Sequence, residues 1–158
     1  MKREISIISR RDFLSAAGGL AAGIALDPAA AAEPAAAPAM REAIRMVVGS
    51  APLSKGKVTL ELPPLVDNGN AVSLSVRVDS PMTPADHVKA IHVFTEKNPQ
   101  PNVVAFHLGP RAGRASVATR IRLADTQTVV AICEMSDGSF WSDSVSVVVT
   151  LAACLEEL

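Results

Sequence analysis

The 158-residue sequence predicts an all-β protein, an immunoglobulin-like β-sandwich of about seven strands with a short N-terminal helix and a flexible C-terminal arm. Three observations predict this class. Short segments alternate apolar and polar residues with a period of two, as half-buried strands do. Turn residues separate these segments at short intervals. Only one segment has the spacing of a helix, and about seven short strands with little helix are typical of a sandwich.

The predicted helix comes first, over residues 40–48, with apolar Ile44, Val47 and Val48 on one side and Gly49 at its end. Seven segments then have the pattern of strands. They are Lys57–Leu62, Val72–Val78, Val88–Phe94, Val103–Leu108, Ser116–Leu123, Thr128–Met135 and Phe140–Leu151. Thr128–Met135 is nearly all apolar, so we expect it to be a central strand covered on both faces.

Turn residues mark the connections between the strands. Residues 67–70, Asp-Asn-Gly-Asn, predict a hairpin turn, because Asn and Gly tolerate left-handed dihedral angles. Residues 136–139 supply a second Asp-Gly turn. The glycine-containing stretch 108–115 resembles an anion-binding loop, but it lacks the strand-to-helix context of one. We interpret it as a connection between strands, in which Arg111 and Arg114 could attract an anionic partner.

Residues 1–32 have the order of a twin-arginine signal peptide. Arg10 and Arg11 precede a weakly apolar run over residues 16–26, and an Ala-Ala-Ala cleavage site follows at residues 30–32. The apolar run is about half of the ~20 residues that span a bilayer, which argues against a membrane anchor. The sequence therefore predicts export by the twin-arginine pathway to the periplasm.

The rest of the chain divides into three parts. Residues 33–38 are rich in Ala and Pro, and we expect them to be disordered. Residues 39–151 hold the helix and the sandwich, and residues 152–158 form the arm with its cysteine. At this length a single folded domain is the natural expectation.

Composition and motifs exclude several functions. A net charge of −1 argues against nucleic-acid binding, as does an aromatic content of 3%. No catalytic triad, pair of carboxylates or nucleotide loop stands out, so we expect no catalytic residue and no cofactor. His87, His92 and His107 lie in separate segments, with His92 pointing away from the core, and we expect no metal site. Trp141 is either part of the core or an interface anchor.

The two cysteines have different surroundings. Cys133 lies within an apolar strand, where a thiol behaves as a small buried hydrophobe. Cys154 follows the last strand, and an arm starting after Thr150 could carry it outward by roughly 13 Å. A disulfide to Cys133 and an incidental thiol are the alternatives to a reactive role. An unpaired exposed cysteine is a liability in an exported protein unless its chemistry is used, which favours a reactive Cys154. The neighbouring Glu156 and Glu157 should raise its pKa.

Three stretches carry a resemblance to a known family: Ala-Asp-His-Val-Lys-Ala-Ile-His-Val-Phe at 85–94, Phe-His-Leu-Gly-Pro-Arg-Ala at 106–112 and Glu-Met-Ser-Asp-Gly-Ser-Phe-Trp at 134–141. With the leader, the sandwich and the tail cysteine, they resemble SoxY, the covalent sulfur carrier of bacterial periplasmic thiosulfate oxidation. The resemblance implies that Cys154 bears sulfur intermediates and that the protein is not an enzyme. It also implies a heterodimer with a SoxZ-like sandwich subunit and encounters with periplasmic sulfur-oxidising enzymes.

The arm departs from the family's Gly-Gly-Cys-Gly-Gly pattern. Residues 152–156 read Ala-Ala-Cys-Leu-Glu, which looks like the SoxY-related subgroup named for an Ala-Ala-Cys-Ile-Glu arm. Such an arm is bulkier and stiffer than one made of glycine. The identity of the sulfur cargo and of the enzymes that load it therefore stays open. The alternative function is a non-catalytic interaction subunit whose cysteine tethers a partner or is vestigial.

Overall fold

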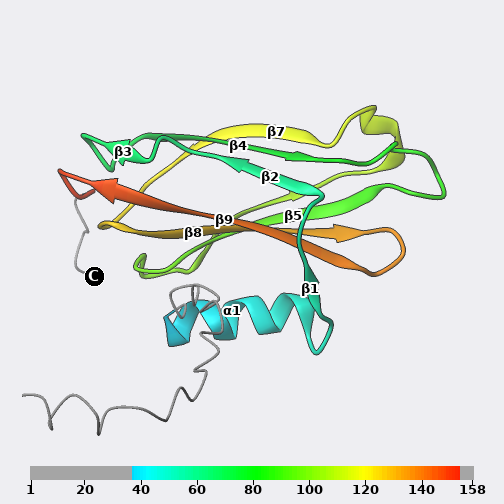
Figure 1. The fold of residues 1–158 in the computed structure, drawn as a ribbon, viewed down its shortest axis with the longest axis horizontal. Helices are drawn as coiled ribbons and strands as arrows, with labels where there is room; N and C mark the ends of the chain where they lie inside the picture. Colours follow the sequence, from blue (N-terminus) through cyan, green and yellow to red (C-terminus); the bar gives the residue numbers. More distant parts are fainter. Residues whose placement is uncertain (1–36, 154–158) are drawn as a thin grey trace, which may run out of the picture. The chain divides into compact units, whose positions relative to one another are not determined.

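A computed structural model describes residues 37–153, which contain one α-helix, one 3-10 helix and nine strands (Figure 1). The helices are α1 (Pro38–Val48) and η1 (Pro110–Ala112). The strands are β1 (Leu53–Ser54), β2 (Val58–Glu61), β3 (Leu65–Val66), β4 (Val72–Val78), β5 (Val88–Thr95), β6 (Asn102–His107), β7 (Ser116–Ile121), β8 (Gln127–Met135) and β9 (Phe140–Val149). The predicted all-β sandwich is confirmed, and each of the seven predicted strands is present.

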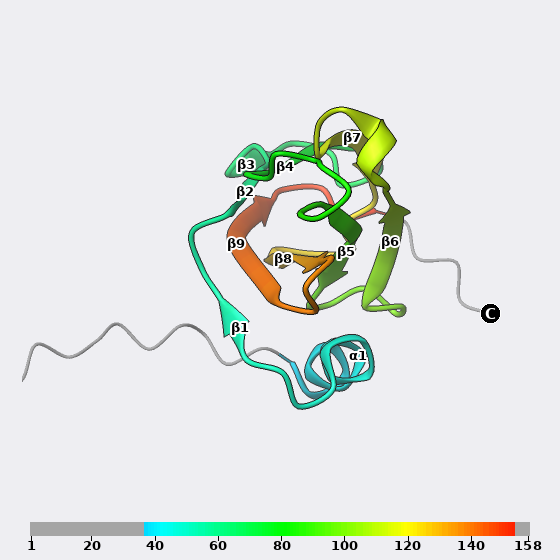
Figure 2. The same ribbon diagram turned by 90° about the vertical axis from the view of Figure 1, so that its right-hand side faces the viewer.

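Two sheets face each other, and the helix covers the outer side of the larger one (Figures 1 and 2). The larger sheet has the order β1-β9-β8-β5-β6, with β3 also paired to β9. The smaller sheet has the order β2-β4-β7. Edge strands β6 and β7 therefore lie on the same side of the sandwich, one in each sheet (Figure 2).

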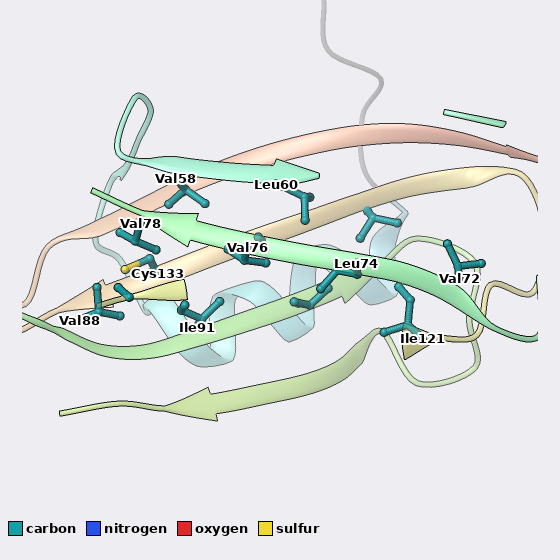
Figure 3. Close-up of a cluster of buried hydrophobic side chains, with 14 of the residues drawn as sticks. Val58, Leu60, Val72, Leu74, Val76, Val78, Val88, Ile91, Ile121 and Cys133 are labelled. Atoms are coloured by element: carbon teal, nitrogen blue, oxygen red, sulfur yellow. The ribbon is translucent and has the colours of Figure 1, made fainter. Parts of the chain in front are cut away.

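The main core fills the space between the sheets. Along β4, Val72, Leu74, Val76 and Val78 are all buried, while the serines and the arginine between them face outward. Figure 3 shows these valines and Leu74 pointing toward side chains of the larger sheet. The period-two alternation in the sequence thus matches a strand with one face in the core and the other toward solvent.

A second, smaller core lies between the larger sheet and α1. Met40 of the helix packs there against Phe94 of β5 and Ile132 of β8, and all three are at most 1% exposed. Strand β8 is consequently buried on both faces, which confirms the prediction of a twice-covered central strand. The helix has an apolar side because Met40, Ala43, Ile44 and Val47 recur at helical spacing.

Strands β1 and β3 were not predicted from the sequence. Each is two residues long and pairs in parallel with β9, so neither has room for an alternating pattern. Between them the chain crosses to the other sheet as β2, and Pro63 and Pro64 limit further pairing after it. These short strands cover the two ends of β9 and bring the segment 65–70 beside the end of the last strand.

Candidate functional site

The base of the C-terminal arm is anchored to the sandwich by several hydrogen bonds. Thr150 donates its backbone N–H to the carbonyl of Val66 (3.0 Å) and its hydroxyl to the carbonyl of Asp67 (3.1 Å). The carbonyl of Leu151 accepts from the N–H of Gly69 (2.8 Å). The structure therefore ties the segment after β9 to the segment that follows β3.

Ala153 is the last anchored residue that the structure describes. Its N–H donates to the carbonyl of Leu123 at 3.1 Å, and its side chain is only 5% exposed. The fixed part of the chain thus extends three residues beyond Thr150. The reach of roughly 13 Å expected for an arm starting after Thr150 was wrong, because Ala153 is buried and bonded. Cys154 itself lies outside the described residues, and its Cα is one peptide unit, about 3.8 Å, from that of Ala153.

Gly69 makes this anchor possible. Its N–H donates to Leu151, and its carbonyl accepts from the N–H of Leu123 (2.8 Å). A Cβ at this position would lie 2.4 Å from the Leu123 carbonyl oxygen and 2.9 Å from the Ala153 nitrogen. No side chain fits into such a close approach of three backbone segments.

The predicted hairpin turn at residues 67–70 was wrong in its geometry. Strands β2 and β4 do pair antiparallel, but the chain between them visits β9 as β3 before it returns. Gly69 is not among the residues with a positive φ, so backbone contact and not a left-handed dihedral angle requires glycine here. The Asp-Gly turn at 136–139 is confirmed, with Gly138 at φ 81° and the N–H of Met135 bonded to the carbonyl of Ser139.

A pocket of about 510 Å³ lies directly beside the arm base. We call it the arm groove. It is lined by Val103 and Val104 of β6, by residues 119–122 on and just after β7, and by Ala153. It therefore occupies the open side of the sandwich between the two edge strands. Its apolar walls come from the valines and Ile121, and Arg120 and Arg122 are its exposed cationic residues.

Cys133 belongs to the main core. Its side chain is fully buried, its sulfur lies 3.6 Å from that of Met135, and burial raises the pKa of the thiol to about 12. In Figure 3 it lies near Val78 and Val88, at the end of the sandwich away from Val72. A buried thiol of such high pKa is not a nucleophile at neutral pH.

A disulfide between the two cysteines does not fit this fold. Cys133 lies six positions along β8 from Gln127, which corresponds to about 20 Å. The arm base is at the Gln127 end, because Thr126 is hydrogen-bonded to Val149 near the end of β9. Since disulfide-linked Cα atoms lie within about 7 Å of each other, Cys133 cannot reach a residue next to Ala153.

The three histidines are not brought together as a metal site. The ring centroids of His92 and His107 are 6.3 Å apart, and His87 immediately precedes β5. Among residues 37–153, no group of three or more His, Cys, Asp or Glu side chains could hold a metal ion. The alternation of residues along β5 correctly predicts that His92 points away from the main core. Its position is nevertheless half-buried beside Phe94 on the side of the sheet that α1 covers, and desolvation and His107 lower its pKa.

The loop of residues 108–115 and Trp141 are the remaining candidates from the sequence, and both have structural roles. Residues 108–115 connect β6 to β7, and hence one sheet to the other, through η1, which confirms a connection between strands. Arg111 and Arg114 are exposed on it. Trp141 is half-buried against the main core, donates to the hydroxyl of Ser139 (3.1 Å), and has the Lys57 ammonium 5.0 Å from its ring centroid. Within the described part of the chain, no helix is long and apolar enough to cross a membrane.

These features define a class of protein: an immunoglobulin-like sandwich whose chain is anchored through Ala153, with a cysteine as the next residue of the sequence. The chain belongs to the SoxY family, described as sulfur oxidation protein SoxY, which matches residues 44–154. The family match thus ends on Cys154. No curated protein sequence matches the chain.

Solved structures agree with this assignment. The sulfur carrier protein SoxY from Chlorobium limicola f thiosulfatophilum is similar over 72% of this chain and 97% of its own, with 26% identity and a TM-score of 0.60. A superoxide reductase (neelaredoxin) from Ignicoccus hospitalis has 17% identity and a TM-score of 0.54 over 60% of this chain and 80% of its own. A superoxide reductase from Nanoarchaeum equitans has 10% identity and a TM-score of 0.52 over 61% of this chain and 100% of its own. The similarity to the two reductases concerns the fold alone.

Proposed function

We propose that this protein is a non-enzymatic covalent sulfur carrier in which Cys154 bears sulfur intermediates and presents them to sulfur-oxidising enzymes of the periplasm. The observation that carries the proposal is the family match, which runs through the sandwich and ends on Cys154. A solved sulfur carrier of the same family, 26% identical, supports it.

The geometry of the described residues supports Cys154 over Cys133 as the carrier. Cys133 is fully buried, and the pKa of its thiol is raised to about 12, so a sulfur substrate cannot reach it without unfolding. Cys154 follows a residue anchored at one end of the sandwich, beside the arm groove. The proposed carrier cysteine thus follows directly on an anchored residue, whereas Cys133 is enclosed in the core.

The chemistry of loading requires a partner enzyme. Joining a thiolate to a thiosulfate-type dianion through a new sulfur–sulfur bond releases two electrons. In the proposed scheme the enzyme that forms the bond accepts these electrons, which agrees with a carrier that visits several catalysts. A SoxZ-like sandwich subunit, exported together with this chain through the signal peptide of residues 1–32, completes the proposed carrier.

The Ala-Ala-Cys-Leu-Glu sequence of residues 152–156 supports the further proposal that this carrier belongs to the SoxY-related subgroup with an Ala-Ala-Cys-Ile-Glu type of arm. Ala153 is buried and bonded to Leu123, whereas a pair of glycines before the cysteine would bend freely. We therefore propose that the enzymes serving Cys154 dock at the end of the sandwich where Ala153 is anchored.

Intact-mass spectrometry of the protein isolated from its own periplasm tests the carrier role. The expected result is a sulfur-containing adduct that reductant removes and that maps to Cys154. The matched control is Cys133→Ala, which should retain the adduct, while Cys154→Ser should lose it. A clean unmodified mass contradicts the proposal. If Cys154→Ser instead abolishes a disulfide-linked complex with a partner, the cysteine is a tether and not a carrier.

A further inference from the structure

The ring of His92 has a nitrogen that forms no hydrogen bond. Its Nδ1 is buried, and within residues 37–153 it is the only buried side-chain nitrogen or oxygen without a hydrogen-bond partner. Buried polar atoms in proteins are almost always bonded, so an unbonded one calls for an explanation. The neutral ring tolerates this position by carrying its proton on Nε2, which leaves a lone pair and no N–H at Nδ1.

His92 lies between the larger sheet and α1. Its register partners in the sheet are Ile132 of β8 and Ala105 of β6, and its ring is stacked 6.3 Å from that of Phe94. Phe94 and Ile132 form the smaller core with Met40 of α1. Figure 2 shows α1 as the described element that covers this face of the sheet. The burial of Nδ1 therefore depends on the helix being in place.

The titratable groups of the sheet around His92 do not favour its protonation. The ring of His107 on β6 lies edge-on to it, with 6.3 Å between the centroids. Glu134 of β8 is on the same face, but it pairs with Lys89. Desolvation is the largest cause that lowers the pKa of His92, His107 lowers the pKa further, and Glu134 opposes both. The buried site thus favours the neutral ring.

The helix that covers His92 has few stabilising features of its own. It has 11 residues, no side-chain hydrogen bond at its N-cap and no acidic residue in its first turn. Its only carboxylate, Glu42, pairs with Arg45 at 2.7 Å on the exposed side, and Arg41 is exposed as well. Helices of this length are marginal in water without packing. Contacts with the sheet therefore hold α1 in place, and α1 offers no carboxylate to a charged His92.

We propose that α1 is a pH-sensitive cover, which is released from the larger sheet when the ring of His92 takes up a proton. The protonated ring has a donor at Nδ1, which finds no acceptor while the helix is docked and is hydrated once the helix lifts. Protons therefore bind the open state more tightly and shift the population toward it. The release exposes the apolar surface shared by Met40, Phe94 and Ile132. It does not depend on the proposed role of Cys154.

The direction of the pH dependence follows from the lowered pKa of His92 in the docked state. Docking is most stable above the ordinary histidine pKa of about 6.5, and it weakens as pH falls below that value. Uptake of one proton changes the opening equilibrium by at most about tenfold per pH unit.

Hydrogen–deuterium exchange of the protein isolated from its own periplasm tests the release. Protection factors, which correct each amide for its intrinsic exchange rate, are compared between about pH 7.5 and about pH 5. The amides of residues 41–48 should be less protected than those of β4, because the helix opens while the sandwich stays folded. Their protection should also fall with pH, by up to about tenfold per unit. Protection of α1 that equals that of β4, or that does not change with pH, would overturn the proposal.

Substitution of the histidines assigns the effect to one ring. His92→Leu replaces the titrating group by an apolar side chain, so the protection of α1 should no longer depend on pH in this range. The matched control is His87→Gln, which removes an imidazole just before β5 whose Nδ1 lies 3.2 Å from the carbonyl oxygen of Thr83. This control should behave as the native protein does. A loss of protection at low pH that persists in His92→Leu contradicts the proposal.

His107→Gln gives a second readout that leaves His92 in place. It should reduce the loss of protection at low pH without abolishing it, because desolvation of His92 remains. In an NMR titration, the pKa of His92 should lie below about 6.5 in the native protein and should rise in His107→Gln. A native pKa of 6.5 or above would also refute the release. None of these measurements bears on the sulfur adduct at Cys154, so failure of the cover and failure of the carrier role are distinguishable.

Discussion

Replacing Gly69 by alanine should release the C-terminal arm from the sandwich. The added methyl group would lie 2.4 Å from the carbonyl oxygen of Leu123, 2.9 Å from the nitrogen of Ala153 and 3.1 Å from Cγ1 of Val149. Two of these neighbours are backbone atoms, which cannot rotate away as the end of a side chain can. The segments must therefore separate, and the hydrogen bonds that join Gly69, Leu123 and Ala153 should lengthen or break.

The expected loss of stability follows from those contacts. A backbone hydrogen bond contributes about 0.5–1.5 kcal/mol net, and overpacking of a buried site costs about 1–3 kcal/mol. Because the segments can relax at the end of the chain, we expect a loss of about 1–3 kcal/mol in the free energy of unfolding. For a domain of this size that lowers Tm by roughly 4–12 °C. The arm, once released, should also expose Cys154 to faster alkylation.

Differential scanning calorimetry and the iodoacetamide rate at Cys154 measure the two effects. Gly109→Ala is the matched control, because Gly109 has an extended backbone (φ −148°) and a Cβ there meets nothing within 4 Å. It should leave both quantities nearly unchanged. A Gly69→Ala protein with the Tm and the alkylation rate of the native protein would refute the anchoring role of this glycine.

Three further predictions concern the core, the helix and export. Burial raises the pKa of Cys133 to about 12, so the thiol of the unfolded chain ionises first as pH rises. The free energy of unfolding should therefore fall by about 1.4 kcal/mol per pH unit above about pH 9. Alkaline denaturation of Cys133→Ala should lack this slope, and an unchanged slope contradicts the raised pKa of Cys133. Met40→Ala should cost about 2–5 kcal/mol in urea denaturation, whereas Met46→Ala, at an 81% exposed position, should cost almost nothing. Arg10→Lys/Arg11→Lys should abolish export. Cell fractionation should then find the protein in the cytoplasm with residues 1–32 still attached. Unchanged export of this variant argues against the twin-arginine route.

Much of the sandwich could be predicted from local patterns. The alternation in β4 and the apolar run of β8 correctly identify buried positions, because burial on a strand repeats every two residues. The core position of Cys133 follows from the same alternation. The place of His92 was only half predicted. Alternation turns it away from the main core, but only the packing of α1 shows that the outer side of the sheet is also covered.

The base of the arm could not be predicted in this way. The signal in the sequence was Gly69, and it was interpreted as a turn glycine because Asp-Asn-Gly-Asn has the composition of a hairpin turn. Its actual role depends on Leu123 and Ala153, which are more than fifty residues away in the chain. The flexible segment was therefore expected to start after Thr150, whereas the structure anchors the chain through Ala153.

The sequence by itself determined the seven longer strands, which side of each faces the core, and that Cys133 belongs to that core. These properties depend on the identity of neighbouring residues, and hydrophobic burial makes them readable locally. Only the tertiary structure decided how the strands divide between two sheets, that β1 and β3 join β9, and that the arm is anchored beside a groove between β6 and β7. Each of these depends on backbone hydrogen bonds between distant segments, and such bonds have no signature in the residues that make them.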